Sequence, residues 1–293
     1  MEMPSPPPRL GIALGGGAAR GWAHIGVLAA LAEQGIEPAV VAGTSMGALV
    51  GGIYAAGRRA ELEAWAGALS RRDLLALVDL SVRGGAIGGQ KLEELYREHL
   101  GEVAIEALPR RFGAVATDLE NGAEVWLREG SLRAAIRASI SLPGVFTPAL
   151  HEGRWLVDGG LVNPVPVTLC RALGADLVVA VDVNSRPGQR YAFAKEGAAP
   201  DAESGERPRP KLREVVMTSL EIMQDRISRA RLAGDPPELL LRPAVGHLPL
   251  LEFSEARFAI DEGHAAVERM RPALEHLLGG GAPLARDGAL PSR

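Results

Sequence analysis

The chain has 293 residues, of which 47% are hydrophobic, so it can bury a substantial core as one large domain. Lysine and arginine total 32 against 36 acidic residues, and the formal net charge of −4 argues against nucleic-acid binding through bulk positive charge. The single cysteine, Cys170, cannot form an internal disulfide, and neither histidines nor Cys170 show the spacing of a zinc site. We therefore expect a cytoplasmic protein with no metal and no cofactor.

Both ends of the chain have the composition of disordered segments. The N-terminus, MEMPSPPPRL, carries an acidic residue and four prolines where a secretory signal would begin with basic residues. We expect a disordered leader over residues 1–9, a single folded domain over residues 10–278 and a disordered tail over residues 279–293. Within the domain, residues 185–210 are rich in proline, glycine and charge, which predicts a mobile loop, either a plain insertion or a lid.

Strand-like segments recur along the domain, several of them separated by stretches with helical periodicity. They cover residues 10–14, 39–42, 112–116, 124–127, 177–183 and 239–241. This alternation predicts an α/β fold with a mainly parallel sheet covered by helices. The first helix should begin near Ala18 and be amphipathic, with one apolar face formed by Trp22, Ile25, Leu28 and Leu31.

Two apolar stretches have a membrane alternative. Residues 39–57 carry no charge and space Gly43, Gly47 and Gly51 four apart, as membrane helices do, but their five glycines and strand-like start favour a strand followed by a helix. The second stretch is a helix ending near Ala233, whose apolar stripe should face the core, with docking onto a membrane or a partner as the alternative. That stripe comprises Leu212, Val216, Leu220, Met223 and Ile227.

The segment GTSMG, from Gly43 to Gly47, matches the pattern G-x-S-x-G where a strand meets a helix. In that context the serine sits on a sharp, strained turn, and side chains at the flanking glycines would collide with the neighbouring strand and helix. Ser45 is therefore a candidate nucleophile.

A glycine-rich segment, GGGAARG, follows the first strand. It fails as a dinucleotide fingerprint because Arg20 stands where the third glycine is required, and it lacks the Gly-Lys-Ser/Thr ending of a phosphate-binding loop. Gly15, Gly16 and Gly17 would instead expose backbone amides at a helix N-terminus, as an oxyanion hole requires, with Arg20 adding positive potential or bracing the loop. A plain glycine turn is the alternative.

A nucleophilic serine needs a base, and the sequence offers two kinds. Histidines at positions 24, 99, 151, 247, 264 and 276 permit a Ser-Asp-His order with His247 or His264 last, although neither lies in a recognisable motif. Asp158 ends an apolar strand and is followed by Gly159 and Gly160, which also suits a simple turn.

The segments GGGAARG, GTSMG and DGG, together with ASISLPGVFTPAL, occur in order, and over residues 10–183 the chain resembles the patatin-like phospholipase family. The resemblance is to its bacterial branch, related to the catalytic domain of neuropathy target esterase. It implies a three-layer α/β/α hydrolase domain that cleaves acyl esters of lipids or phospholipids without a metal. Peripheral contact with the inner face of a membrane would suit such a lipid hydrolase, although the sequence offers no span or lipid anchor.

Carried over by position, the resemblance makes Ser45 the nucleophile and Asp158 the base of a dyad that lacks a histidine. Gly15, Gly16 and Gly17 supply the oxyanion hole, and the supporting residues are Arg20, Gly43, Gly47, Gly159 and Gly160. The family motif often has glycine where this chain has Arg20, so the resemblance does not decide which amides form the oxyanion hole. A catalytically weak scaffold and a Ser-His-Asp triad hydrolase are the alternatives. With an aspartate base, we expect activity to persist below about pH 6, where a histidine base would be protonated.

Overall fold

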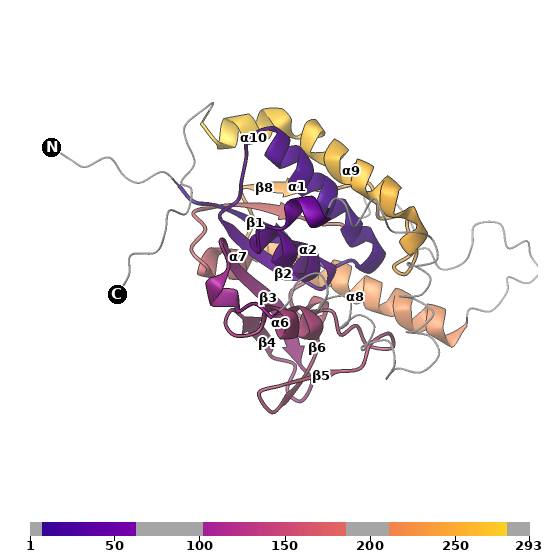
Figure 1. The fold of residues 1–293 in the computed structure, drawn as a ribbon. Coiled ribbons are helices and arrows are strands. Elements are labelled where there is room, and N and C mark those ends of the chain that lie inside the picture. Colours follow the sequence, from indigo (N-terminus) through magenta and orange to yellow (C-terminus); the bar gives the residue numbers. More distant parts are fainter. Residues whose placement is uncertain (1–7, 63–101, 186–210, 280–293) are drawn as a thin grey trace, which may run out of the picture.

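The computed structural model describes residues 8–62, 102–185 and 211–279 (Figure 1). The predicted leader (residues 1–9), loop (185–210) and tail (279–293) lie outside these ranges except at their edges. In the described ranges, eight strands form one sheet in the order β5-β6-β3-β2-β1-β7-β8, with β4 paired to β3. The strands are β1 (Leu10–Leu14), β2 (Val40–Thr44), β3 (Arg111–Asp118), β4 (Glu124–Leu127), β5 (Ala149–His151), β6 (Arg154–Asp158), β7 (Leu177–Val181) and β8 (Leu239–Leu241).

The five strands from β3 to β8 along this order run parallel, whereas β4, β5 and β6 pair antiparallel. Strands β1 and β2 are buried along their whole length, as parallel strands covered on both faces must be. The helices are α1 (Ala23–Glu33), α2 (Met46–Ala55), α6 (Leu132–Ser139), α7 (Val167–Ala172), α8 (Leu212–Gly234), α9 (Ala256–Arg269) and α10 (Arg271–Leu277). Short 3-10 helices are η1 (Ala18–Trp22), η2 (Ile105–Ala107), η3 (Gly159–Leu161) and η4 (Phe253–Glu255).

Two hydrophobic cores lie on opposite faces of the sheet. The larger core joins the strands to α1, α2, α6 and α9, and the smaller one joins them to α7 and the end of α8. Successive residues of β1 alternate between the two: Ile12 and Leu14 face the larger core and Ala13 the smaller. This arrangement confirms the predicted three-layer α/β/α fold with a mainly parallel sheet.

The charge-free run of residues 39–57 forms β2 and α2. No helix in the described ranges is both long and apolar enough to cross a membrane. The glycines in this run serve close packing between helix and sheet: a Cβ at Gly47 would collide with the Leu14 carbonyl, and one at Gly51 would lie 2.9 Å from Val41. Gly47 and Gly51 therefore mark the side of α2 that packs on the strands.

The expectation of an amphipathic first helix was wrong. Helix α1 is buried on nearly every side because α9 packs along it while its other side lies on the sheet. The contact between the two helices is close enough to require glycine on both: a Cβ at Gly26 would collide with the Ile260 carbonyl, and one at Gly263 with the Ala23 carbonyl. A polar face has no place in such a helix.

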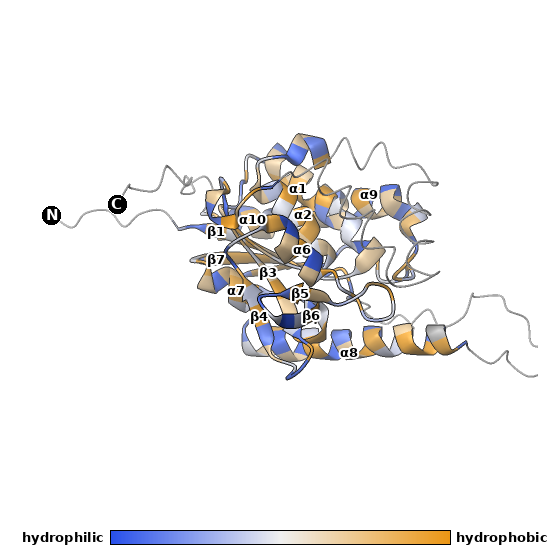
Figure 2. Cartoon of the chain, turned by 60° about the horizontal axis from the view of Figure 1, so that its bottom comes forward, coloured by the Kyte–Doolittle hydropathy of each residue, from blue (hydrophilic) through white to orange (hydrophobic). Residues whose placement is uncertain are grey.

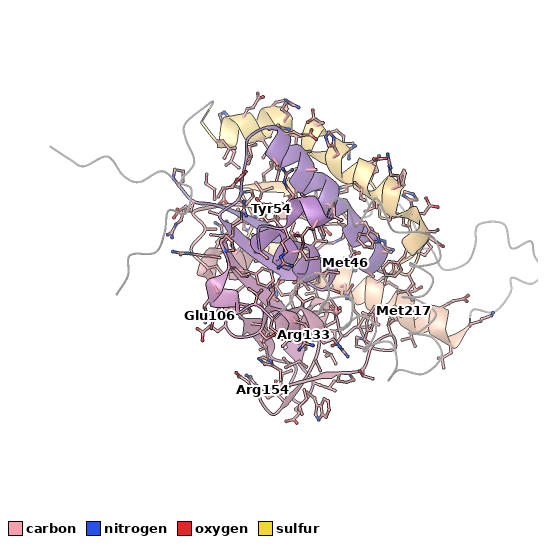
Figure 3. All side chains as sticks on the ribbon, in the orientation of Figure 1. Met46, Tyr54, Glu106, Arg133, Arg154 and Met217 are labelled. Carbon is pink, nitrogen blue, oxygen red and sulfur yellow. The ribbon has the colours of Figure 1, made fainter. Side chains whose placement is uncertain are left out.

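The expected core-facing stripe of α8 was also largely wrong. Leu220 is buried, but Leu212 is 79% exposed, Val216 44% and Met223 49%. Figure 2 shows that the first half of α8, which Met217 marks in Figure 3, extends past the strands, so the sheet does not cover its apolar stripe there.

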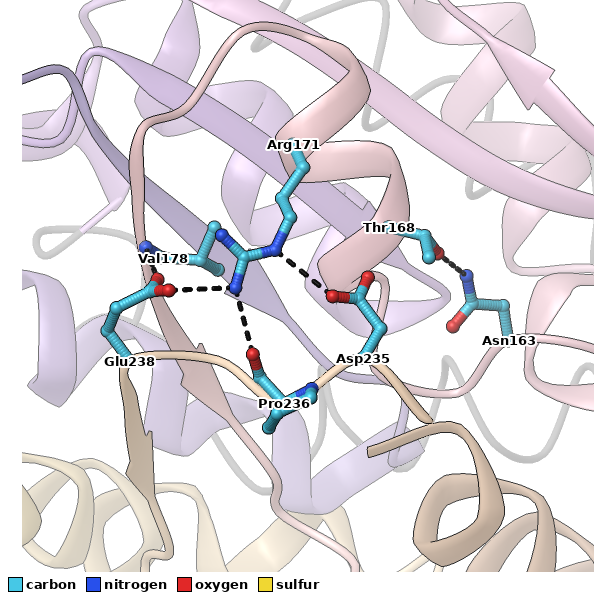
Figure 4. Close-up of polar contacts among 7 residues, drawn as sticks. All are labelled: Asn163, Thr168, Arg171, Val178, Asp235, Pro236 and Glu238. Atoms are coloured by element: carbon cyan, nitrogen blue, oxygen red, sulfur yellow. Dashed lines mark hydrogen bonds and ion pairs between the residues drawn. The ribbon is translucent and has the colours of Figure 1, made fainter. Parts of the chain in front are cut away.

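The other end of α8 is held firmly. Arg171 of α7 donates to Asp235 Oδ1 at 3.1 Å, to the Pro236 carbonyl at 2.8 Å and to Glu238 Oε1 at 2.9 Å (Figure 4). Glu238 in turn accepts the Val178 amide at 2.6 Å, which ties this turn to β7. Helix α8 is thus anchored near its C-terminus while its N-terminal half reaches past the sheet.

Candidate active site

Ser45 occupies the turn between β2 and α2, immediately before Met46, which Figure 3 labels near the centre of the molecule. Its backbone has φ 54° and ψ −123°, which costs energy for any residue that carries a Cβ. The Ser45 amide donates to Ser139 Oγ at 2.8 Å, and that hydroxyl donates to the Val115 carbonyl at 2.6 Å. A buried hydroxyl of α6 therefore holds the strained turn against β3.

The glycines around this turn leave no room for a side chain. A Cβ at Gly43 would lie 2.5 Å from the backbone of α2, and one at Gly47 would collide with the Leu14 carbonyl. At the turn that follows β6, a Cβ at Gly159 would collide with the Val115 carbonyl. These positions demand glycine because backbone passes directly beside them, as the sequence predicted for Gly43 and Gly47.

Asp158, the last residue of β6, meets Ser45 across 113 residues of sequence. The Ser45 hydroxyl donates to Asp158 Oδ2 at 2.5 Å, and the Gly160 amide donates to Oδ1 at 2.7 Å. The Asp158 backbone is fixed as well, because its amide donates to the Ser141 carbonyl and its carbonyl accepts from Thr117 Oγ1. Both carboxylate oxygens are thus satisfied, and one of them faces the serine hydroxyl.

Burial sets the basicity of this carboxyl. Asp158 is 1% exposed, and loss of hydration raises its pKa from 3.8 to about 6, although hydrogen bonds from Ser45 and Gly160 oppose the shift. At neutral pH the group is ionised but is a stronger base than an exposed aspartate. It is therefore suited to accept a proton from the hydroxyl that it contacts.

The glycine-rich loop directs two of its amides away from Ser45. The Gly15 amide donates to the Val181 carbonyl at 3.0 Å, and the Gly16 amide donates to the Pro164 carbonyl at 2.9 Å. Both bonds pin the loop to the polypeptide at the end of β7 and before α7. These two amides already have acceptors, so neither is free to bind an oxyanion without breaking a bond.

The next amides are different. Within the described ranges the Gly17 and Ala18 amides donate to no other group, and the same holds for Met46 at the start of α2. The loop lies against the nucleophile, since a Cβ on Gly16 would be 3.3 Å from Ser45 Cβ. Ala18 has φ 45°, a conformation that turns the chain sharply at the start of η1. The unused amide donors beside Ser45 therefore lie at the C-terminal end of the glycine-rich loop and at the start of α2.

Two buried side chains brace this loop. Arg20 is fully buried and donates to the Leu248 carbonyl at 2.7 Å and to Glu221 Oε2 of α8 at 3.1 Å, so its charge is paired inside the protein. His24 Nε2 lies 2.7 Å from the Gly15 carbonyl, and burial lowers its pKa to about 4. The imidazole is neutral at physiological pH and donates to this carbonyl.

In the described chain, no histidine hydrogen-bonds to Ser45. His264 Nε2 pairs with Glu33 at 2.9 Å, and His247 packs edge-on against Phe258. His99 lies outside the described ranges. The described residues also contain no group of three His, Cys, Asp or Glu side chains placed to hold a metal ion.

Sequence reasoning overlooked three polar residues of this region. Ser139 lies in the ASISLPG segment, where its position before DGG, the last of the three glycine motifs, was the available signal. Asn184 and Glu221 carry no motif at all, and only the fold brings them to the loop.

Residues 12–171 match the family model of the patatin-like phospholipases, and the chain belongs to this family. An NTE family protein of Mycobacterium tuberculosis is 46% identical over 197 residues, which cover 67% of this chain and 52% of the relative. Another from the same organism is 29% identical over 88% of this chain and 45% of the relative. The chain thus spans about half the length of these relatives.

More distant proteins share part of the sequence or the fold. Patatin-like phospholipase domain-containing protein 7 of mouse is 33% identical over 189 residues, 60% of this chain and 14% of that protein. The crystal structure of VipD from Legionella pneumophila shares the fold, with a TM-score of 0.50 and 14% identity over 92% of this chain and 67% of that chain.

Proposed function

We propose that this protein is a serine esterase that hydrolyses acyl ester bonds of lipids through Ser45 and Asp158. The observation that carries the proposal is the 2.5 Å hydrogen bond from the Ser45 hydroxyl to a buried carboxylate. It is supported by the strained turn that presents the serine and by the family to which the chain belongs. A phospholipase A, a lysophospholipase and a carboxylesterase are all compatible with this chemistry.

The reaction begins when Ser45 Oγ attacks the ester carbonyl carbon while Asp158 accepts the hydroxyl proton. The carbonyl oxygen becomes an oxyanion, and unused amides at Gly17, Ala18 and Met46 are the donors that we assign to it. The intermediate then expels the alcohol, which takes the proton from Asp158 and leaves an acyl group on Ser45. Water attacks this ester and gives a proton to Asp158, and the bond from the acyl carbon to Ser45 Oγ then breaks. Ser45 Oγ takes the proton back from Asp158 as the fatty acid leaves.

This assignment narrows the oxyanion hole predicted from the sequence. Of Gly15, Gly16 and Gly17, only Gly17 has an amide without an acceptor in the described ranges. Losing a single oxyanion donor typically lowers kcat by about 10²–10³-fold. The hole therefore depends on how the loop orients very few amides.

The raised pKa of Asp158 supports a different pH profile from the one expected from the sequence, in which activity persists below about pH 6. Burial raises this pKa to about 6, so kcat/KM should fall as the pH drops through that value and the base becomes protonated. A histidine base would produce nearly the same profile. Variants, and not the pH profile, must therefore separate the dyad from a triad.

Hydrolysis of p-nitrophenyl butyrate and release of fatty acid from lysophosphatidylcholine test the proposed function. Ser45→Ala and Asp158→Asn should abolish or nearly abolish both activities, with folding checked by circular dichroism, whereas His264→Ala and His247→Ala should retain them. Loss of activity in a folded histidine variant would favour the triad. A folded wild type that hydrolyses neither ester would favour the scaffold alternative.

We also propose that α8 contacts the lipid surface on which such substrates lie. Its projecting half exposes Val215, Val216, Ile222 and Met223, an apolar strip at helical spacing. Val216→Ser and Met223→Ser should each weaken co-sedimentation with phospholipid vesicles roughly tenfold through lost apolar burial. Leu150→Ser, at an exposed apolar position on β5, is the control that should bind as wild type does. Equal binding by all three variants would count against this contact.

A further inference from the structure

Asn184 lies just beyond β7, outside every motif of the sequence, yet its buried side chain reaches the glycine-rich loop. Its Nδ2 donates to the Gly16 carbonyl at 2.8 Å, and its Oδ1 accepts from Arg20 Nη1 at 2.9 Å. Its backbone amide donates to Asp182 Oδ1 at 3.0 Å, which holds the residue itself in place. The side chain therefore connects the loop to the bracing arginine.

Chemistry fixes the orientation of this amide group. A guanidinium only donates hydrogen bonds, so the oxygen of Asn184 must face Arg20 and the NH₂ group must face the Gly16 carbonyl. Arg20 cannot turn away easily, because its other nitrogens donate to the Leu248 carbonyl and to Glu221. A flipped amide would place two donors against each other and two acceptors against each other.

The bond to the Gly16 carbonyl also orients the next amide. In a trans peptide the carbonyl of one residue and the N–H of the following residue point in opposite directions. His24 shows the same relation one peptide earlier: it holds the Gly15 carbonyl, and the Gly16 amide points to the Pro164 carbonyl. Asn184 therefore turns the Gly17 N–H away from itself, and this amide has no acceptor in the described chain.

We propose that Asn184 is a positioning residue of the oxyanion hole, which aims the Gly17 amide at the oxyanion by holding the Gly16 carbonyl. The inference rests on the proposed esterase function and extends it to a residue that does not touch the substrate. Through Arg20 and Glu221 the same hydrogen-bonded chain reaches α8. The orientation of the loop is thus built from three segments that are distant in sequence.

Asn184→Asp tests this role with almost no change in shape. The carboxylate can still accept from Arg20, but it cannot donate to the Gly16 carbonyl and repels it. Asn121→Asp is the matched control, because Asn121 lies in an exposed turn where its oxygen accepts the Ala123 amide at 2.8 Å. Both variants are compared with wild type for the melting temperature and for the fraction of sites labelled at completion by a fluorophosphonate.

The decisive readouts are kinetic, taken per active site with p-nitrophenyl butyrate. For Asn184→Asp we expect kcat to fall about 10- to 100-fold with KM within about twofold, since misaiming one donor costs no more than deleting it. The inhibition constant of a trifluoromethyl ketone, whose adduct with Ser45 carries an oxyanion, should weaken by a similar factor. Asn121→Asp should match wild type in all of these.

A purely structural role would lower the melting temperature and the labelled fraction but leave kcat per active site unchanged, and that result would overturn the proposal. If Asn184→Asp does not fold, Asn184→Ser removes the same bond without adding charge, and the same comparison decides. A wild type without esterase activity or labelling would overturn the proposed function together with this inference. An active wild type matched by an equally active folded variant would overturn the positioning role alone.

Discussion

The buried carboxyl of Asp158 should contribute less to the stability of the protein at neutral pH than at acidic pH. Its pKa is 3.8 when exposed and about 6 in the folded chain, a difference of roughly two units, and each unit corresponds to about 1.4 kcal/mol. The folded state therefore holds this proton more tightly than the unfolded state. The resulting stability is fully present below about pH 4 and is lost as the pH rises through about 6, a total of about 3 kcal/mol.

Asp158→Asn removes this titration while keeping the hydrogen bonds, because the new amide can accept from Gly160 and donate to Ser45 Oγ. We expect the variant to gain about 3 kcal/mol over wild type in the free energy of unfolding between about pH 4 and about pH 7. His24 titrates in the opposite sense, since burial lowers its pKa to about 4, but it does so in both proteins and cancels in the difference.

Urea unfolding followed by circular dichroism at several pH values measures this difference directly. Asp261→Asn, which removes an exposed carboxyl of α9, controls for the loss of a surface charge and should show a much smaller dependence. A difference between wild type and Asp158→Asn that stays constant across this pH range, or that has the opposite sign, would refute the reasoning from burial.

Three further variants test the packing around the site. Ser45→Gly should be more stable than Ser45→Ala by about 1 kcal/mol in urea unfolding, because glycine relieves the strain at φ 54°, and equal stabilities would argue against that strain. Ser139→Ala leaves the buried Ser45 amide without its acceptor, so it should lower the free energy of unfolding by about 1–3 kcal/mol and also lower kcat. An unchanged kcat would show that this hydrogen bond to the Ser45 turn is not needed for catalysis. Gly263→Ala should lower stability by about 1–3 kcal/mol because its methyl group meets the Ala23 carbonyl, and an unchanged melting temperature would show that α9 can shift freely.

Local pattern was sufficient for much of the fold. All six of the strands expected from alternating or continuous apolar runs occur within one or two residues of their expected ends, since strand propensity and turn residues act locally. The strand expected over residues 112–116, for example, extends to Asp118. The short strand β5 was missed because Ala149–His151 is a three-residue edge strand without a distinctive pattern. The three-layer fold then followed from the alternation of strands and helices.

Burial of a helix face was harder to predict because it depends on what lies beyond the helix. Helix α1 is covered by α9, whose approach requires glycines that no periodicity announces. Helix α8 shows the reverse case, since Val216 and Met223 of its apolar strip stay exposed where the helix extends past the sheet. Sequence periodicity reports a stripe, but only the arrangement of layers decides whether the stripe is buried.

The candidate site divides in the same way. Ser45 and Asp158 were proposed from motifs, because each lies on a glycine turn that the local sequence reveals. Their contact across 113 residues is a property of the sheet order, which places β6 beside β3 and β3 beside β2. Asn184 is 164 residues from Arg20, and no local signal connects the two. Motifs thus point to the proposed reacting groups, whereas the residues that we propose position them emerge only from the fold.

The central claim is that Ser45 is a nucleophile activated by Asp158. The most direct test is intact-protein mass spectrometry after reaction with a fluorophosphonate, for wild type, Ser45→Ala and Asp158→Asn, each with folding verified by circular dichroism. We expect a single adduct on Ser45 in wild type, none in Ser45→Ala and strongly slowed labelling in Asp158→Asn. Two results would contradict this proposal: a folded wild type that forms no adduct, or a folded Asp158→Asn that is labelled as fast as wild type.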